Sequence, residues 1–238
     1  MATLRVINSD SSGNGYIIDC GSDQLIIELG CSWKDILVKL NYDLSRVCAA
    51  LVTHKHQDHS KSIPNALKYG LSVHSCEDVQ SIHPEVKVLK KGVKTRIGSF
   101  LVQPIPVSHS VECYAFLIEH RDFGRLVVCT DCDSFPYKIK NVNHWLIESN
   151  YSKDLVIDRM CEGYDSRSQS GNHLEINDTI EILKRNFSPE LRTIILLHLS
   201  ASNSDEDEFW YRVRQEVGFD NVHIAHTGLC ISLDKDDF

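Results

Sequence analysis

The sequence predicts an α/β protein in which two β-sheets lie between outer layers of helices. Short apolar runs with the length of strands recur along all 238 residues, and stretches with helical spacing separate them. Hydrophobic residues make up 42% of the chain, enough to bury a substantial core. We find no linker and no internal repeat, so we expect a single domain over residues 1–238.

The expected elements follow the chain in order. Strands at 3–8 and 15–20 flank a turn-rich loop, and a third strand at 25–28 leads to a helix that Ser32 caps and that runs to about Leu40. The polar segment 163–172 is expected to be a loop. Further strands are expected at 47–52, 71–74, 86–89, 93–97, 100–105, 113–119, 125–130, 143–148, 192–198, 222–225 and 229–233, and further helices at 62–69, 77–82, 153–161, 174–186 and 205–217.

The composition argues against several classes of protein. No run of eighteen apolar residues occurs, so no membrane span is expected. The N-terminus enters a strand-like pattern directly and lacks the apolar region of a signal peptide. The nine cysteines are odd in number and irregularly spaced, which with this N-terminus predicts reduced thiols in a cytoplasmic protein.

Two local features allow more than one interpretation. Cys129 and Cys132 form a Cys-x-x-Cys pair that could be a redox site, although a metal site explains this segment better. The basic stretch Lys87 to Arg96 could contact a phosphate backbone, but the default interpretation is the solvated face of a hairpin. The net charge of −8 also argues against broad electrostatic binding to nucleic acid.

The strongest local pattern is a cluster of three histidines and an aspartate directly after the apolar run 47–52: His54, His56, Asp58 and His59. Alternate residues of an extended segment face the same way, so His54 and His56 can point at one ion. Asp58 and His59 lie where the chain turns and can reach a second ion. Imidazole nitrogens with a carboxylate suit zinc, and also manganese or iron.

The His-x-His-x-Asp-His pattern resembles the signature of the metallo-β-lactamase superfamily, which implies the αββα fold. His109 is similar to the third motif of that superfamily, and Asp131 to the fourth, whose carboxylate bridges both metals. His198 is similar to the fifth. Each of the three follows an apolar run, where loops can present ligands at one edge of a sheet.

The resemblance therefore implies seven metal ligands, which are His54, His56, Asp58, His59, His109, Asp131 and His198. Two divalent ions, zinc most of all with Mn²⁺ or Fe²⁺ as alternatives, would lower the pKa of a bridging water and give hydroxide near neutral pH. They would also bind substrate oxygens and stabilise developing negative charge. The expected reaction class is hydrolysis, which leaves phosphodiesters, thioesters and amides open as substrates.

The last third of the chain narrows this choice. The segment 146–151, Leu-Ile-Glu-Ser-Asn-Tyr, resembles the Glu-Ala-Asn-Tyr motif of YycJ-type (WalJ, VicX) metallo-hydrolases, which are relatives of ribonuclease Z. Further similarities lie at 11–15, at His173-Leu174 and at 198–203. This resemblance runs from about residue 5 to residue 230 and implies a nuclease that acts on the ends of DNA or RNA.

The same resemblance assigns catalytic roles to Asp58, His173 and Glu148. His173 would protonate the leaving oxygen while Glu148 holds it, and an alkoxide leaving group does need such an acid. The sequence departs from the family pattern around this histidine. Asn172 replaces a glycine, and Glu175 would add negative charge near the expected position of the phosphate.

We thus expect a dinuclear metal-dependent phosphodiesterase, of the DNA or RNA exonuclease type, with a nucleic acid substrate. The alternative is a small-molecule hydrolase of the same fold, acting on cyclic nucleotides or thioesters, which the acidic net charge favours modestly. A third hypothesis is a binding or redox module like the di-iron relatives. Those relatives carry an added flavin domain for which this chain has no room.

Overall fold

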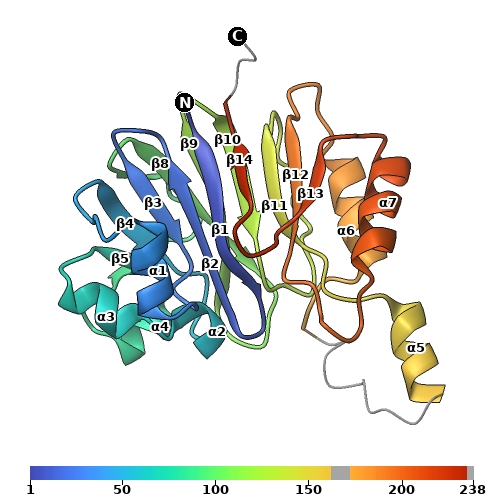
Figure 1. The fold of residues 1–238 in the computed structure, drawn as a ribbon, viewed down its shortest axis with the longest axis horizontal. Helices are drawn as coiled ribbons and strands as arrows, with labels where there is room; N and C mark the ends of the chain where they lie inside the picture. Colours follow the sequence, from blue (N-terminus) through green and yellow to red (C-terminus); the bar gives the residue numbers. More distant parts are fainter. Residues whose placement is uncertain (162–171, 235–238) are drawn as a thin grey trace.

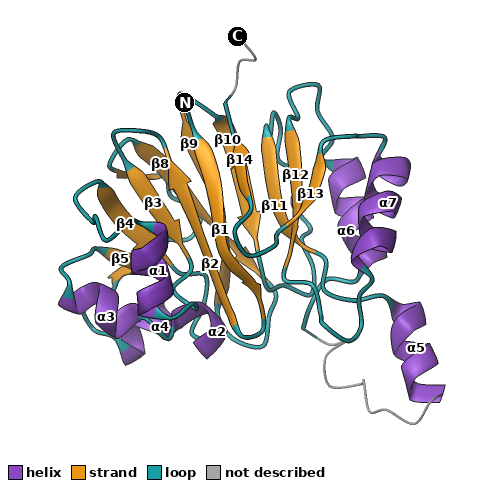
Figure 2. Cartoon of the chain, viewed as in Figure 1, coloured by secondary structure: helices purple, strands orange, loops and turns teal. Residues whose placement is uncertain are grey.

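The computed structural model describes residues 1–161 and 172–234, so most of the loop expected at 163–172 lies outside the described residues. The chain forms two seven-stranded sheets (Figures 1 and 2). The first sheet contains, in spatial order, β14 (Cys230–Ser232), β1 (Thr3–Asp10), β2 (Gly13–Asp19), β3 (Gln24–Ile27), β4 (Val47–Leu51), β5 (Val73–Ser75) and β6 (Lys87–Val88).

The second sheet contains, in spatial order, β13 (Val222–Ile224), β12 (Thr193–Leu197), β11 (His144–Glu148), β10 (Gly124–Cys129), β9 (Cys113–His120), β8 (Phe100–Val107) and β7 (Thr95–Ile97). Both sheets are mixed: β10 to β13 are parallel, whereas β7 to β10 are antiparallel. The carboxyl ends of the parallel strands meet at one edge, where ligands bind in sheets of this kind.

Helices lie on the outer side of each sheet, except that the helix at residues 153–161 extends away from both sheets (Figure 1). The helices are α1 (Trp33–Lys39), α2 (Gln57–Ser60), α3 (Ile63–Lys68), α4 (Glu77–Ile82), α5 (Lys153–Cys161), α6 (Ile176–Arg185) and α7 (Glu206–Val217). Ser32 caps α1 as expected, since its side chain accepts a hydrogen bond from the backbone of Asp35. No helix in the described part of the chain is both long and apolar enough to cross a membrane.

Two apolar clusters hold these layers together. The central cluster joins side chains from both sheets, including Ile17 and Leu25 of the first and Phe116 of the second. The outer cluster packs the second sheet against α6 and α7, with Trp145 and Phe209 fully or almost fully buried. Burying one such side chain contributes about 1.5–3 kcal/mol. The predicted sandwich of two sheets between helices is confirmed.

Two expectations about local structure were incomplete or wrong. The short helix α2, which begins directly after His56, was not predicted. The hairpin expected over Lys87 to Arg96 does not exist, because β6 lies at the edge of the first sheet and β7 at the edge of the second. The basic stretch is the crossover between the sheets. It turns at Gly92, whose φ of +73° favours glycine.

Candidate metal centre

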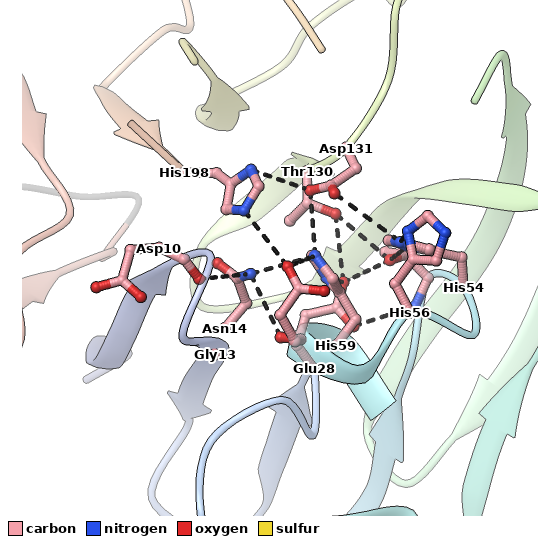
Figure 3. Close-up of polar contacts among 12 residues, drawn as sticks. Asp10, Gly13, Asn14, Glu28, His54, His56, His59, Thr130, Asp131 and His198 are labelled. Atoms are coloured by element: carbon pink, nitrogen blue, oxygen red, sulfur yellow. Dashed lines mark hydrogen bonds and ion pairs between the residues drawn. The ribbon is translucent and has the colours of Figure 1, made fainter. Parts of the chain in front are cut away.

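The predicted metal ligands come together at one edge of the sandwich, where strands of both sheets end. Figure 3 shows His54, His56, His59, Asp131 and His198 of this set. His54 and His56 follow β4, and α2 carries Asp58 and His59. The second sheet supplies the other three, which follow β8, β10 and β12: His109, Asp131 and His198. The strand ends therefore place seven side chains that span 145 positions of the sequence around one point.

One group of four consists of His54, His56, His109 and Asp131, whose ligand-type atoms all lie within 4.8 Å of one another. His56 Nδ1 lies 2.9 Å from His54 Nε2 and 3.2 Å from His109 Nε2. Asp131 Oδ2 lies 3.9 Å from each of those two Nε2 atoms. Ligand atoms around a tetrahedral zinc ion are separated by about 3.3 Å, so the spacing fits one such ion.

A second group consists of Asp58, His59, Asp131 and His198. His59 Nε2 lies 3.2 Å from both Asp58 Oδ2 and Asp131 Oδ1. His198 closes the group, with Nδ1 3.2 Å from Asp131 Oδ1 and Nε2 3.6 Å from Asp58 Oδ2. Asp131 therefore presents Oδ2 to the first group and Oδ1 to the second, so that both groups share one carboxylate.

Hydrogen bonds fix which nitrogen of several histidines faces the centre. Thr53 Oγ1 donates to Glu28 Oε1 at 2.6 Å, so it accepts the bond of 2.9 Å from His54 Nδ1. His109 Nδ1 donates to the carbonyl oxygen of Asn172 at 2.9 Å. Both rings therefore turn an Nε2 lone pair toward their group, as metal-binding histidines do.

The local electrostatics also fit cations. Burial lowers the pKa of His54 well below its usual value and lowers the pKa of His109, so both rings are neutral and able to ligate. Asp131 Oδ1 is buried, lies 3.2 Å from both His59 Nε2 and His198 Nδ1, and makes no hydrogen bond to any described residue. Buried lone pairs of this kind are satisfied by a positive ion. The donor set therefore fits divalent metal ions.

The pair of His173 and Glu148 lies beside this centre. His173 Nδ1 is 2.5 Å from Glu148 Oε1 and 4.0 Å from Asp131 Oδ2. Glu148 is completely buried, and its Oε2 accepts hydrogen bonds from the backbone of Cys132 and Leu174. Burial lowers the pKa of His173, but the hydrogen bond and charge of Glu148 outweigh this, and the pKa lies above its usual value.

Glu175 does not act as its position in the sequence suggests. Its carboxylate is buried and accepts hydrogen bonds from Asn177 N at 2.9 Å and Lys153 N at 3.3 Å. It therefore caps α6 and binds the start of α5. Its negative charge is taken up by helix termini, which favour anions. The capping role of Glu175 was not predicted from the sequence.

Several supporting residues were not predicted. Glu28 is fully buried, adopts a left-handed φ of +65°, and lies with Oε1 3.2 Å from His59 Nδ1. Ser9 Oγ accepts a hydrogen bond from His198 N at 3.0 Å, and Asn150 Nδ2 donates to His198 O at 2.7 Å. These contacts hold His198 at its strained φ of +53°. The sequence did offer one signal for Glu28, because it is an acidic residue at the end of an otherwise apolar run, 25–28.

The cysteines are all free, as expected. Cys129 and Cys132 lie on either side of Asp131 and are buried, with their Sγ atoms 3.2 Å apart. Burial and the neighbouring Cys129 raise the pKa of Cys132 well above the usual value of a thiol. A protonated, buried thiol is a poor nucleophile, which disfavours Cys132 as an attacking thiol.

Comparisons with known proteins agree with this geometry. No protein-family model matches the chain. Exodeoxyribonuclease WalJ of Streptococcus pneumoniae is 25% identical over 223 residues, which cover 84% of this chain and 82% of that protein. Exodeoxyribonuclease YycJ of Bacillus anthracis is 26% identical over 220 residues, which cover 84% and 83%. The predicted resemblance to YycJ-type hydrolases is confirmed.

Solved structures show the same fold. The metallo-β-lactamase fold protein YhfI from Bacillus subtilis aligns with a TM-score of 0.76 at 17% identity over 97% of this chain and 98% of that one. The short form of human tRNase Z aligns with a TM-score of 0.69 at 12% identity over 97% and 99%. The metallo-β-lactamase fold is thereby confirmed. With the histidine and aspartate groups described above, these comparisons support the prediction of a metal-dependent hydrolase.

Proposed function

We propose that this metal-dependent hydrolase is a dinuclear phosphodiesterase that removes nucleotides from the ends of DNA. The two groups that share Asp131 support a pair of ions, and the relatives named exodeoxyribonuclease support the substrate. Bound divalent ions supply an activated water and positive charge for phosphate oxygens. The rest of the reaction depends on side chains of this chain.

The observation that carries the proposal is the contact between His173 and Glu148. Cleavage of a DNA strand releases an alkoxide, which must be protonated as it leaves. With Nδ1 held by Glu148, His173 retains Nε2 to donate that proton, and the side chain is 21% exposed, so substrate can reach it. Because Glu148 raises the pKa of His173, the protonated form persists to higher pH.

Glu148 itself is a positioning residue. Its Oε1 contacts His173 Nδ1 and His198 Nδ1, and its Oε2 is occupied by two backbone groups. It therefore has no free oxygen to take part in proton transfer with substrate. Asp58 is 23% exposed and borders the second group, which supports a role in binding the ion that faces the substrate.

The leaving group provides the test. We would measure cleavage of end-labelled DNA and RNA, single- and double-stranded, and of bis(p-nitrophenyl) phosphate, with zinc or manganese supplied. A nitrophenolate leaves without a proton, so His173→Ala should slow DNA cleavage by about 10²–10⁴-fold and affect the nitrophenyl ester far less. Asp58→Ala should lose both activities, whereas His83→Ala, which alters a histidine outside the centre, should retain both.

Other outcomes would redirect the proposal. An equal loss on both substrates in His173→Ala would contradict the general acid. Cleavage of small phosphodiesters without cleavage of polymers would favour the small-molecule hydrolase.

Native mass spectrometry gives an independent test of the dinuclear centre. We expect two divalent ions per chain in wild type, and one or none in Asp131→Ala.

A further inference from the structure

The outer face of the second sheet is covered by helices only in part. Helices α6 and α7 lie against the β11 to β13 side of this sheet (Figure 1). Toward the other edge, outward-facing side chains of β8 to β10 border two hollows instead. Leu101 pairs with Glu119 and Gln103 with Leu117 across β8 and β9, and Glu119 pairs with Arg125 across β9 and β10, so these residues form adjacent rows.

The two hollows meet at Arg125, which lines both. One has a volume of about 610 Å³ and the other about 410 Å³. We call the two together the basic groove. Five cationic side chains line it, and Glu119 is the single carboxylate among the lining residues: the cations are Arg96, Arg121, Arg125, Lys138 and Lys140. This is a cationic surface on a chain whose net charge is −8.

Most of these cations are free to bind an anion. Glu119 already pairs with Lys94 at 2.9 Å and with Arg125 at 3.6 Å, and Arg121 pairs with Asp122 at 3.3 Å. Within residues 1–161 and 172–234, no carboxylate lies within ion-pair distance of the three remaining exposed cations, Arg96, Lys138 and Lys140. Exposed Tyr137 lies in the same hollow as both lysines and offers a ring on which a base can stack.

The basic groove begins beside the metal centre. Tyr137 Oη donates a hydrogen bond of 2.7 Å to Pro106 O, and Asp133 N donates one of 2.9 Å to Ser108 O. These bonds join the segment that follows Asp131 to the end of β8, which leads into His109. From Pro106 the groove follows β8 back to Leu101, about 17 Å at 3.3 Å per residue.

We propose that the basic groove binds the phosphates of a single nucleic acid strand whose end lies in the metal centre. Cations that track a backbone, together with an aromatic ring, are the usual features of a surface that binds single strands without sequence preference. This inference rests on the proposed function, because it identifies where the uncleaved part of a polymer substrate lies. It also explains how a chain of net charge −8 can bind a polyanion, because five cations and a single carboxylate line this groove.

The test uses charge reversal at the two lysines that make no ion pair. Lys138→Glu/Lys140→Glu should weaken binding of a fluorescent single-stranded DNA on the order of tenfold. The slope of log Kd against log salt concentration should fall by about 0.7 for each lost phosphate contact. Lys34→Glu/Lys68→Glu makes the same charge change on α1 and α3 and should leave both quantities near those of wild type. Lys138→Arg/Lys140→Arg should retain wild-type binding.

Hydrolysis of bis(p-nitrophenyl) phosphate separates this proposal from the proposed function. If wild type cleaves DNA and the reversed variant loses DNA cleavage but keeps the small ester, the basic groove binds the strand. If the reversed variant binds and cleaves DNA like wild type, or if the control variant loses as much, the groove is not the binding surface. If wild type itself cleaves no DNA, the proposed function has failed instead. Equal weakening for sequences of different composition is also expected, because phosphate contacts carry no sequence information.

Discussion

Glu28 Oε1 lies 3.2 Å from His59 Nδ1, and both side chains are completely buried. The same carboxylate accepts hydrogen bonds from Thr53 Oγ1 at 2.6 Å and Thr130 Oγ1 at 3.3 Å. Glu28 thus lies at ion-pair distance behind His59, without a hydrogen bond between them, and contacts His54 through Thr53. A carboxylate behind a ligating histidine increases its basicity and fixes its ring.

Replacing Glu28 tests this arrangement. Glu28→Gln keeps the shape of the side chain and removes its charge, so we expect metal affinity to fall about 10–100-fold. Competition with a fluorescent zinc chelator measures the affinity without relying on activity. Glu85→Gln, at an exposed position, provides the matched control. Unchanged zinc affinity in Glu28→Gln would show that His59 does not depend on this carboxylate.

The pH profile should depend on Glu148. The general acid is active when protonated, so the rate falls as pH rises through the pKa of His173. Glu148 raises that pKa. Removing its charge in Glu148→Gln should therefore move the alkaline limb of kcat to lower pH. Metal content must be measured in parallel, since Glu148 also contacts His198. A limb at the wild-type position, with full metal content, would rule out His173 as the titrating acid.

Gly30 allows the loop that carries Asp58 to approach closely. A Cβ atom built at Gly30 would lie 1.6 Å from the carbonyl oxygen of Asp58, a backbone atom that cannot move aside alone. Gly30→Ala should destabilise the fold by about 3 kcal/mol through overpacking and weaken metal binding by shifting Asp58 and His59. Thermal unfolding and zinc titration check both effects.

The matched control for that substitution is Gly218→Ala. Gly218 ends α7 with a φ of +72°, and a Cβ there would meet no atom within 4 Å. This variant should cost about 1–2 kcal/mol for the left-handed backbone alone and leave metal binding unchanged. If the two variants lose zinc affinity equally, close packing at Gly30 is not what positions the loop.

His144 should make stability depend on pH. It is fully buried, and desolvation lowers its pKa from 6.5 to about 4. Above pH 6.5 both folded and unfolded states are neutral at this residue. Between pH 6.5 and 4 only the unfolded state takes up the proton, so stability is lost as pH falls, by about 3 kcal/mol in total. Denaturant unfolding of wild type and His144→Phe at several pH values isolates this contribution, which should be missing in the variant.

The sequence predicted the fold and the grouping of ligands because both have local signals. The motif at 54–59 lies within six residues, and each later ligand follows a strand whose apolar run is easy to recognise. The resemblance to the superfamily motifs assigned His109, Asp131 and His198. The structure brings them together because β10 and β12 run in the same direction, and β8, two antiparallel pairings away from β10, does so too.

The features that the sequence did not predict arise from long-range contacts. Glu28 contacts Thr53 and Thr130, which lie 25 and 102 positions away. The stretch Lys87 to Arg96 was misinterpreted because two short strands joined by a glycine turn read alike in a hairpin and in a crossover. The structure distinguishes the two because β6 pairs with β5 in the first sheet and β7 pairs with β8 in the second.

The spread of the centre along the chain has a consequence for its synthesis. Six of the seven candidate ligands are made by residue 131, but His198 comes 67 residues later, on a strand that pairs between β11 and β13. Its backbone N–H is held by Ser9, which lies 189 positions earlier in the chain. Since domains fold as units during translation, a nascent chain carries an incomplete centre until its last strands are made. A growing polypeptide therefore cannot assemble the second group of ligands, or the metal-dependent chemistry that relies on it, before residue 198 has been made.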